Sequence, residues 1–111
     1  MLDVKDKPTF MLKLGSRVTK ANTASIEAME ESVKRNARSF LILDLKDTSA
    51  MDTFALSTLI SIRQRLNKYG GDLGIINMTP AIRTLLYLTR TVAVLPGYRN
   101  AEHAYKVMMG G

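Results

Sequence analysis

FLILDLKDTSAMDTFALSTLISIRQRLNK, at residues 40–68, is the stretch that organises this chain. Residues 40–45 form an apolar run without polar alternation, which is typical of a strand covered on both faces by helices. From Leu56 onward, apolar residues recur at intervals of three and four and predict one side of a helix. That helix is expected to end at Gly70-Gly71, where glycine adopts the left-handed cap conformation without steric cost.

Polar residues join this predicted strand to the predicted helix. Residues 46–49 have the composition of a turn, and either Asp52 or Thr53 is placed to cap the helix by accepting a hydrogen bond from a backbone N–H. Loops after the carboxyl ends of strands often form sites in sheet-and-helix folds, because helix N–H groups and the helix dipole converge there. Such a position tolerates a phosphate, so Thr53 is a candidate regulatory hydroxyl as well as a candidate cap.

The flanking sequence predicts further strands and helices. Apolar runs bounded by turn residues predict strands at residues 8–14, 73–77 and 92–95, with shorter ones at Val4 and at residues 17–18. Three more helices are expected from their capping residues, which are Asn22 or Thr23, Thr79 with Pro80 in the first turn, and Asn100. The helix after Thr79 is expected to pack through Ile82, Leu85, Leu86 and Leu88.

Length and composition favour one domain, spanning residues 1–111. The chain is long enough for one hydrophobic core but not for two. No apolar run is long enough to span a bilayer, and the first residues lack the apolar segment of a signal peptide. The chain contains no cysteine, which excludes disulfides and thiolate metal sites. We therefore expect a cytoplasmic protein without a membrane span. The sequence does not indicate its oligomeric state.

Positive charge is concentrated in the second half of the chain. Residues 1–53 carry nine Lys/Arg against eight Asp/Glu, whereas residues 54–111 carry seven against two. This imbalance fits a surface for an acidic partner, for anionic lipid or for nucleic acid, and it also fits ordinary solvated side chains. Aromatic residues make up only 6% of the chain and do not alternate with basic ones, so we expect no direct binding of nucleic acid.

Catalytic chemistry is not expected from these residues. His103 is the only histidine and is remote from other candidate groups, and Asp52 and Thr53 are neighbours whose side chains point in different directions at a helix start. Gly70-Gly71 lacks the spacing of a phosphate-binding loop. The sequence therefore predicts a binding protein and not an enzyme, with no catalytic, cofactor or metal site.

Residues 40–60 resemble the signature of the STAS domain, which occurs in bacterial anti-anti-sigma factors (anti-sigma factor antagonists). That signature has a strand ending in Asp-Leu, then an Asp-Ser/Thr pair and a Gly-Leu-Gly-x-Leu-Leu helix. Asp44-Leu45 and Asp52-Thr53 match the first two elements, while Ala55 and Ser57 replace the two glycines of the third. A single α/β domain is implied, with a mixed central sheet of about four to five strands packed with about four α-helices.

The resemblance continues after residue 68. Gly70-Gly71 is followed by Asp72-Leu73, and residues 77–82 match an Asn-x-x-Pro-x-Val pattern. Arg90 stands where the family has the glycine of a Leu-Thr-Gly motif, and a left-handed backbone there would cost Arg on the order of 1 kcal/mol relative to Gly. Near the N-terminus, Thr19 replaces the carboxylate of a Gly-x-Leu-Asp turn.

By this resemblance, the domain is expected to be an anti-sigma factor antagonist in a partner-switching pathway. The unmodified form would bind an anti-sigma factor that is a serine/threonine kinase of the GHKL type, and phosphorylation of Thr53 would switch that binding off. A PP2C-type phosphatase would reset it. The expected partner contacts are Asp52, Thr53, Phe54, Ala55, Ser57, Thr58 and Ser61. The alternative is a STAS scaffold or accessory subunit that is never phosphorylated, in a stressosome-type assembly or a phospholipid-transport ABC complex.

Overall fold

Four parallel strands form the central sheet, in the order β1-β3-β5-β6. The computed structural model describes residues 9–35 and 39–110. Within them the strands of this sheet are β1 (Thr9–Lys13), β3 (Phe40–Asp44), β5 (Asp72–Ile76) and β6 (Gly97–Tyr98). The predicted central position of β3 is confirmed, since it pairs with β1 on one side and with β5 on the other.

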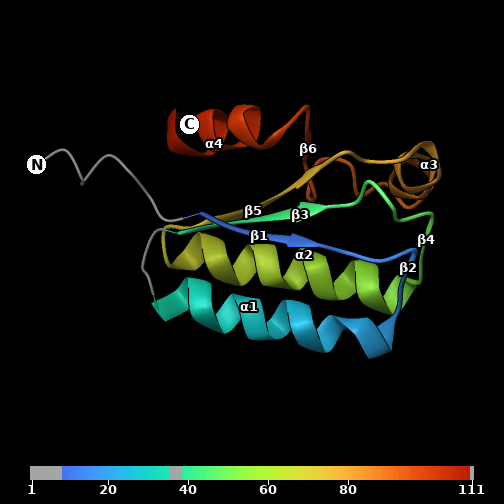
Figure 1. Cartoon of the computed structure of the whole chain (residues 1–111), viewed down its shortest axis with the longest axis horizontal. Coiled ribbons are helices and arrows are strands. Elements are labelled where there is room, and N and C mark those ends of the chain that lie inside the picture. The colour runs from blue at the N-terminus through green and yellow to red at the C-terminus, as the bar shows by residue number, and fades with distance from the viewer. Residues whose placement is uncertain (1–8, 36–38, 111) are drawn as a thin grey trace, which may run out of the picture.

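Helices cover both faces of the sheet and one of its ends (Figure 1). They are α1 (Thr23–Arg35), α2 (Thr53–Lys68), α3 (Pro80–Leu88) and α4 (Ala101–Gly110), with a short 3-10 turn η2 (Lys20–Asn22) before α1. In Figure 1, α1 and α2 lie side by side on one face, α4 lies on the opposite face, and α3 lies beyond one end of the strands. No helix among the described residues is long and apolar enough to cross a membrane.

The apolar run of β3 is buried on both faces, as its lack of alternation predicts. Leu41 and Leu43 belong to the main core between the sheet and helices α1 and α2. Ile42 points the other way and packs with Ala104 of α4 in a smaller cluster. Phe40 contacts the ring of Tyr105 edge-on, with 5.8 Å between the ring centroids. Helices on both sides therefore hold β3 rigidly, which fixes the point where the chain leaves it.

A second, two-stranded sheet lies beyond the central one. It consists of β2 (Arg17–Val18) and β4 (Ala50–Met51), which run parallel with Val18 opposite Met51. The short strand at residues 17–18 is predicted by the sequence, whereas its partner β4 is not. This pairing brings the segment before α1 against the segment before α2, although more than 30 residues separate them in the chain.

Two expectations about the second half are wrong. Residues 92–95 form turns instead of a strand, with only Leu95 buried, and the last strand is β6, which pairs with Ile75 and Ile76 of β5. Leu88 is 72% exposed, so it does not pack under α3 with Ile82 and Leu86. The expected strand at Val4 lies outside the described residues.

Arg90 keeps the left-handed backbone that the family glycine would adopt, with φ of 59°. The N–H of Arg90 donates to Tyr87 O and the N–H of Thr91 donates to Leu86 O, which is the hydrogen-bond pattern of a Schellman cap. An L-residue with a Cβ is strained in this conformation, whereas glycine is not.

Arg90→Gly should therefore stabilise the domain. We expect the free energy of unfolding in urea to rise by about 1 kcal/mol, because the cap geometry is kept and the strain is removed. Arg83→Gly, in the interior of the same helix, is the matched control and should lower stability by about 1 kcal/mol. Equal destabilisation by both changes would show that Arg90 is not strained.

Candidate functional site

Thr53 is the first residue of α2, and Asp52 is the residue that caps the helix. Asp52 Oδ1 accepts a hydrogen bond from the N–H of Ala55 at 2.7 Å, which resolves the choice between the two predicted caps. Thr53 is exposed, and within residues 9–35 and 39–110 its hydroxyl has no hydrogen-bond partner. An unengaged hydroxyl thus lies at the positive end of the α2 dipole.

Asp52 also ties the start of α2 to the segment before α1. Its backbone N–H donates to Val18 O at 3.1 Å, and its Oδ2 accepts from the N–H of Lys20 at 3.4 Å. Thr19 lies beside it, on the wall of a cavity of about 140 Å³ that Asp52 also lines. Thr19 thus lies near the start of α2, with a hydroxyl where the family has a carboxylate.

Phe54 and the polar residues that follow it form one exposed strip along α2. Phe54 is 49% exposed, and Lys20 Nζ lies 5.3 Å from the centroid of its ring, within cation–π range. Ser57 is exposed, while Thr58 and Ser61 are half-buried, and all three lie on the same helix face as Phe54 by their spacing. We call this set the switch surface; its members are Asp52, Thr53, Phe54, Ser57, Thr58 and Ser61.

Ala55 does not belong to the switch surface, which corrects its assignment as a partner contact. Its side chain is fully buried in the main core. A residue without accessible surface makes no contact with a docking protein. The replacement of the family glycine at this position therefore affects packing under the helix, whereas the replacement at the exposed Ser57 changes the surface itself.

Hydrogen bonds at the carboxyl end of the sheet hold the loop that leads to the switch surface. Buried Thr48 donates its hydroxyl proton to Gly15 O at 2.7 Å, and Thr79, the cap of α3, donates to Thr48 O at 2.6 Å. Asp44 accepts from Asn77 Nδ2 at 3.0 Å. Burial tends to raise the pKa of Asp44, but the hydrogen bonds from the Lys46 N–H and from Asn77 outweigh it and lower the pKa below its ordinary value. The two family motifs that contain Asp44 and Asn77 thus meet in one contact.

Sequence reasoning missed two basic residues that lie beside the switch surface. Lys20 lies over Phe54, and Arg17 lines the same small cavity as Asp52. Their placement depends on the β2–β4 pairing, and a strand of two residues leaves no periodic pattern to detect. His103, by contrast, is remote from Thr53 in the sequence and lies on α4 across the sheet. Among the described residues, no group of three or more His, Cys, Asp or Glu is arranged to hold a metal ion.

The comparison with known protein families agrees with the observed fold. A model of the STAS domain matches residues 2–104, which is most of the chain. The chain belongs to the STAS domain family. The predicted resemblance and the predicted α/β fold class are therefore confirmed, and the pairings between the described strands are all parallel.

One curated relative of this STAS domain carries a functional name. It is the anti-sigma F factor antagonist of Paenibacillus polymyxa, which is 25% identical over 76 residues. The match covers 68% of this chain and 65% of that protein, so it spans slightly less than two thirds of the relative's length.

Several solved structures share the fold at low sequence identity. A sulfate transporter family protein from Wolinella succinogenes has a TM-score of 0.76 at 10% identity and covers 96% of this chain and 93% of its own. An anti-sigma-factor antagonist (STAS) domain protein from Planctomyces limnophilus has a TM-score of 0.72 at 16% identity, covering 88% of each chain. SpoIIAA, an anti-sigma factor antagonist in its unphosphorylated form, has a TM-score of 0.73 at 15% identity, covering 96% and 92%. At these identities the likeness establishes the fold alone.

Proposed function

We propose that this STAS domain is an anti-sigma factor antagonist in a phosphorylation-controlled partner-switching pathway. Its unphosphorylated form binds an anti-sigma factor that is a serine/threonine kinase of the GHKL type, through the switch surface. Phosphorylation of Thr53 ends that binding, and a PP2C-type phosphatase restores it. The observation that carries the proposal is the exposed hydroxyl of Thr53 at the first residue of α2, which has no hydrogen-bond partner among the described residues and lies directly beside exposed Phe54.

The switch surface combines an aromatic side chain, a strip of short polar side chains and a firmly held helix start, which together favour the docking of a protein partner. Phe54 offers an aromatic anchor, and aromatic side chains are enriched among the residues that dominate binding energy at interfaces. The short polar side chains that follow leave a low, uncharged strip on which a partner helix or loop can lie. The start of α2 is held by Asp52 and the hydrogen bonds around Thr48, so the surface is fixed before a partner arrives.

Phosphate on Thr53 would act through charge. At neutral pH a phosphothreonine carries close to two negative charges, and here it would stand next to the carboxylate of Asp52. The helix dipole and backbone N–H groups tolerate that charge in the free protein, whereas a docked partner would have to bury it. The similar SpoIIAA has been solved in phosphorylated as well as unphosphorylated form, which supports a switch of this kind.

A STAS scaffold or accessory subunit is the alternative, since the same fold occurs in a sulfate transporter family protein. In that case Thr53 would be a contact residue that is never modified, and the exposed apolar residues at the end of α3, Tyr87 and Leu88, would belong to a permanent interface. Purification of the chain from its native cell separates the two cases. Recovery of a transport ATPase or a large homotypic particle, without an anti-sigma factor, would favour the alternative.

Phosphorylation should occur at Thr53 alone. We expect incubation with an anti-sigma kinase of the same organism and Mg-ATP to give one phosphate per chain, mapped to Thr53 by tandem mass spectrometry. The Thr53→Ala variant should take up none, and Thr58→Ala should behave as the unchanged chain, because the Thr58 hydroxyl is already bonded to Phe54 O at 2.9 Å. Modification of another hydroxyl in the unchanged chain would refute the assignment.

A further inference from the structure

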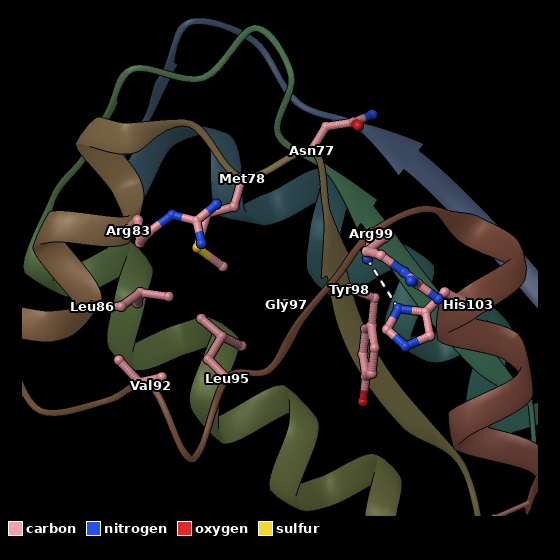
Figure 2. Close-up of a pocket in the computed structure, with 10 residues that line it drawn as sticks. All are labelled: Asn77, Met78, Arg83, Leu86, Val92, Leu95, Gly97, Tyr98, Arg99 and His103. Carbon is pink, nitrogen blue, oxygen red and sulfur yellow. Dashed lines mark hydrogen bonds between the residues drawn. The ribbon is translucent and has the colours of Figure 1, made fainter.

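A cavity of about 400 Å³ opens between α3 and α4, across β6 (Figure 2). It is separate from the switch surface, with which it shares no residue. Its volume falls within the range of small-molecule sites, which are commonly about 300–1,000 Å³. The residues that line it are Asn77, Met78, Arg83, Leu86, Val92, Leu95, Gly97, Tyr98, Arg99 and His103.

One wall of this cavity is apolar. Leu86 of α3 and Leu95 of the turn before β6 are each 1% exposed, and Figure 2 shows them on the same side of the cavity with Val92. Gly97 keeps the middle open, because a Cβ at this position would lie only 2.8 Å from Met78 Cε. The apolar wall is suited to the body of an organic ligand and not to a hydrated inorganic ion.

Arg83 brings positive charge into the cavity. In Figure 2, Arg83 extends from α3 toward the centre, whereas Arg99 and His103 lie on the opposite side and the Arg99 side chain runs away from Arg83. His103 Nδ1 accepts the backbone N–H of Arg99 at 3.1 Å, which leaves its Nε2 as the nitrogen that carries a proton. The ten lining residues include no carboxylate, and in the described part of the chain neither guanidinium has an ion-pair or hydrogen-bond partner.

We propose that this cavity binds a small organic anion. A carboxylate, sulfonate or phosphate group would lie against Arg83, whose planar guanidinium group matches the geometry of such anions. The apolar body of the ligand would lie against Met78 and Val92, which have accessible surface in the cavity. The proposal gives a role to part of the positive charge that accumulates in residues 54–111, and it does not depend on the function proposed for Thr53.

Two fluorescent probes that differ in one charged group test the proposal. 1-Anilinonaphthalene-8-sulfonate has an apolar body with a sulfonate, and N-phenyl-1-naphthylamine has the same body without it. We expect the sulfonate probe to bind at least about fivefold more tightly to the unchanged chain. Octanoate should displace it, whereas 1-octanol and inorganic phosphate should not. Equal binding of both probes, or displacement by 1-octanol or by phosphate as effective as that by octanoate, would overturn the proposal.

Substitutions locate the bound probe. Arg83→Met removes the guanidinium from an exposed position, so the fold is kept, and it should weaken binding of the sulfonate probe about fivefold. Lys106→Met, an equal loss of charge on α4 outside the cavity lining, is the control and should leave binding unchanged. Gly97→Val should fill the cavity and abolish binding while far-UV circular dichroism reports an intact fold. Unchanged affinity of the Arg83→Met variant would overturn the proposal.

Discussion

Thr53→Asp should lower the affinity of the domain for the anti-sigma factor proposed as its partner by about 100-fold or more, whereas Thr53→Ala should bind within about threefold of the unchanged chain. Asp adds a carboxylate that the partner would have to bury beside Asp52, and like charges brought together at an interface cost several kcal/mol. Ala removes only a hydroxyl that has no hydrogen bond in the described structure. Isothermal titration calorimetry with the kinase, in the absence of ATP, measures both affinities.

The loss of binding expected for Thr53→Asp would not be explained by unfolding of α2. A carboxylate at the first position of a helix interacts favourably with the helix dipole, by about 0.3–1 kcal/mol. We therefore expect Thr53→Asp to unfold at the same urea concentration as the unchanged chain or at a slightly higher one. Ser57→Asp is the matched control, since it places the same charge about one turn farther along the switch surface, and it should reduce affinity less. Equal affinity of the Ala and Asp variants would exclude Thr53 as a charge switch.

The sequence predicts the framework of this site because its signals are local. The unbroken apolar run of β3 requires cover on both faces, and the three-and-four spacing from Leu56 requires a helix with one buried side. Caps depend on a few neighbouring residues, so Thr79 with Pro80, and Asn100, are predicted correctly. The position of Thr53 at a strand-to-helix junction follows from these elements alone.

The parts that sequence reasoning missed depend on long-range contacts. The β4 strand exists because Arg17-Val18 lies beside it, and neither partner is long enough to have a pattern of its own. Residues 92–95 have the β propensity of a strand, but the sheet edge beside β5 is taken by Gly97-Tyr98, and propensity yields to tertiary pairing. The family resemblance predicts Ala55 as a surface contact, but Ala55 lies on the buried side of α2.

Arg65 of α2 has a buried partner on α1. Its Nε and Nη2 donate to the two carboxylate oxygens of Glu30 at 2.7 and 2.9 Å. Glu30 lies on α1 and is 4% exposed, while the Arg65 side chain is 43% exposed. The hydrogen bond to Glu30 raises the pKa of Arg65 above its ordinary value. This bidentate pair fixes α2, and with it the switch surface, against α1.

Arg65→Met should lower the free energy of unfolding by about 2–3 kcal/mol, measured by urea denaturation. Breaking a fully buried ion pair typically costs about 3–5 kcal/mol. We expect a smaller loss here because water reaches the Arg65 side chain from one side. Glu30→Leu should cost less, about 1 kcal/mol, since the arginine left behind can turn its charge into solvent while the glutamate cannot.

The double variant Glu30→Leu with Arg65→Met separates the ion pair from the packing of the two stems. Both charges are then absent and two apolar side chains of similar volume meet between α1 and α2, so stability should return to within about 1 kcal/mol of the unchanged chain. Recovery would show that the loss in Arg65→Met comes from an unpaired buried carboxylate. A double variant no more stable than Arg65→Met would mean that the arginine stem, and not its charge, holds α2 against α1. In that case the orientation of the switch surface would depend on packing alone.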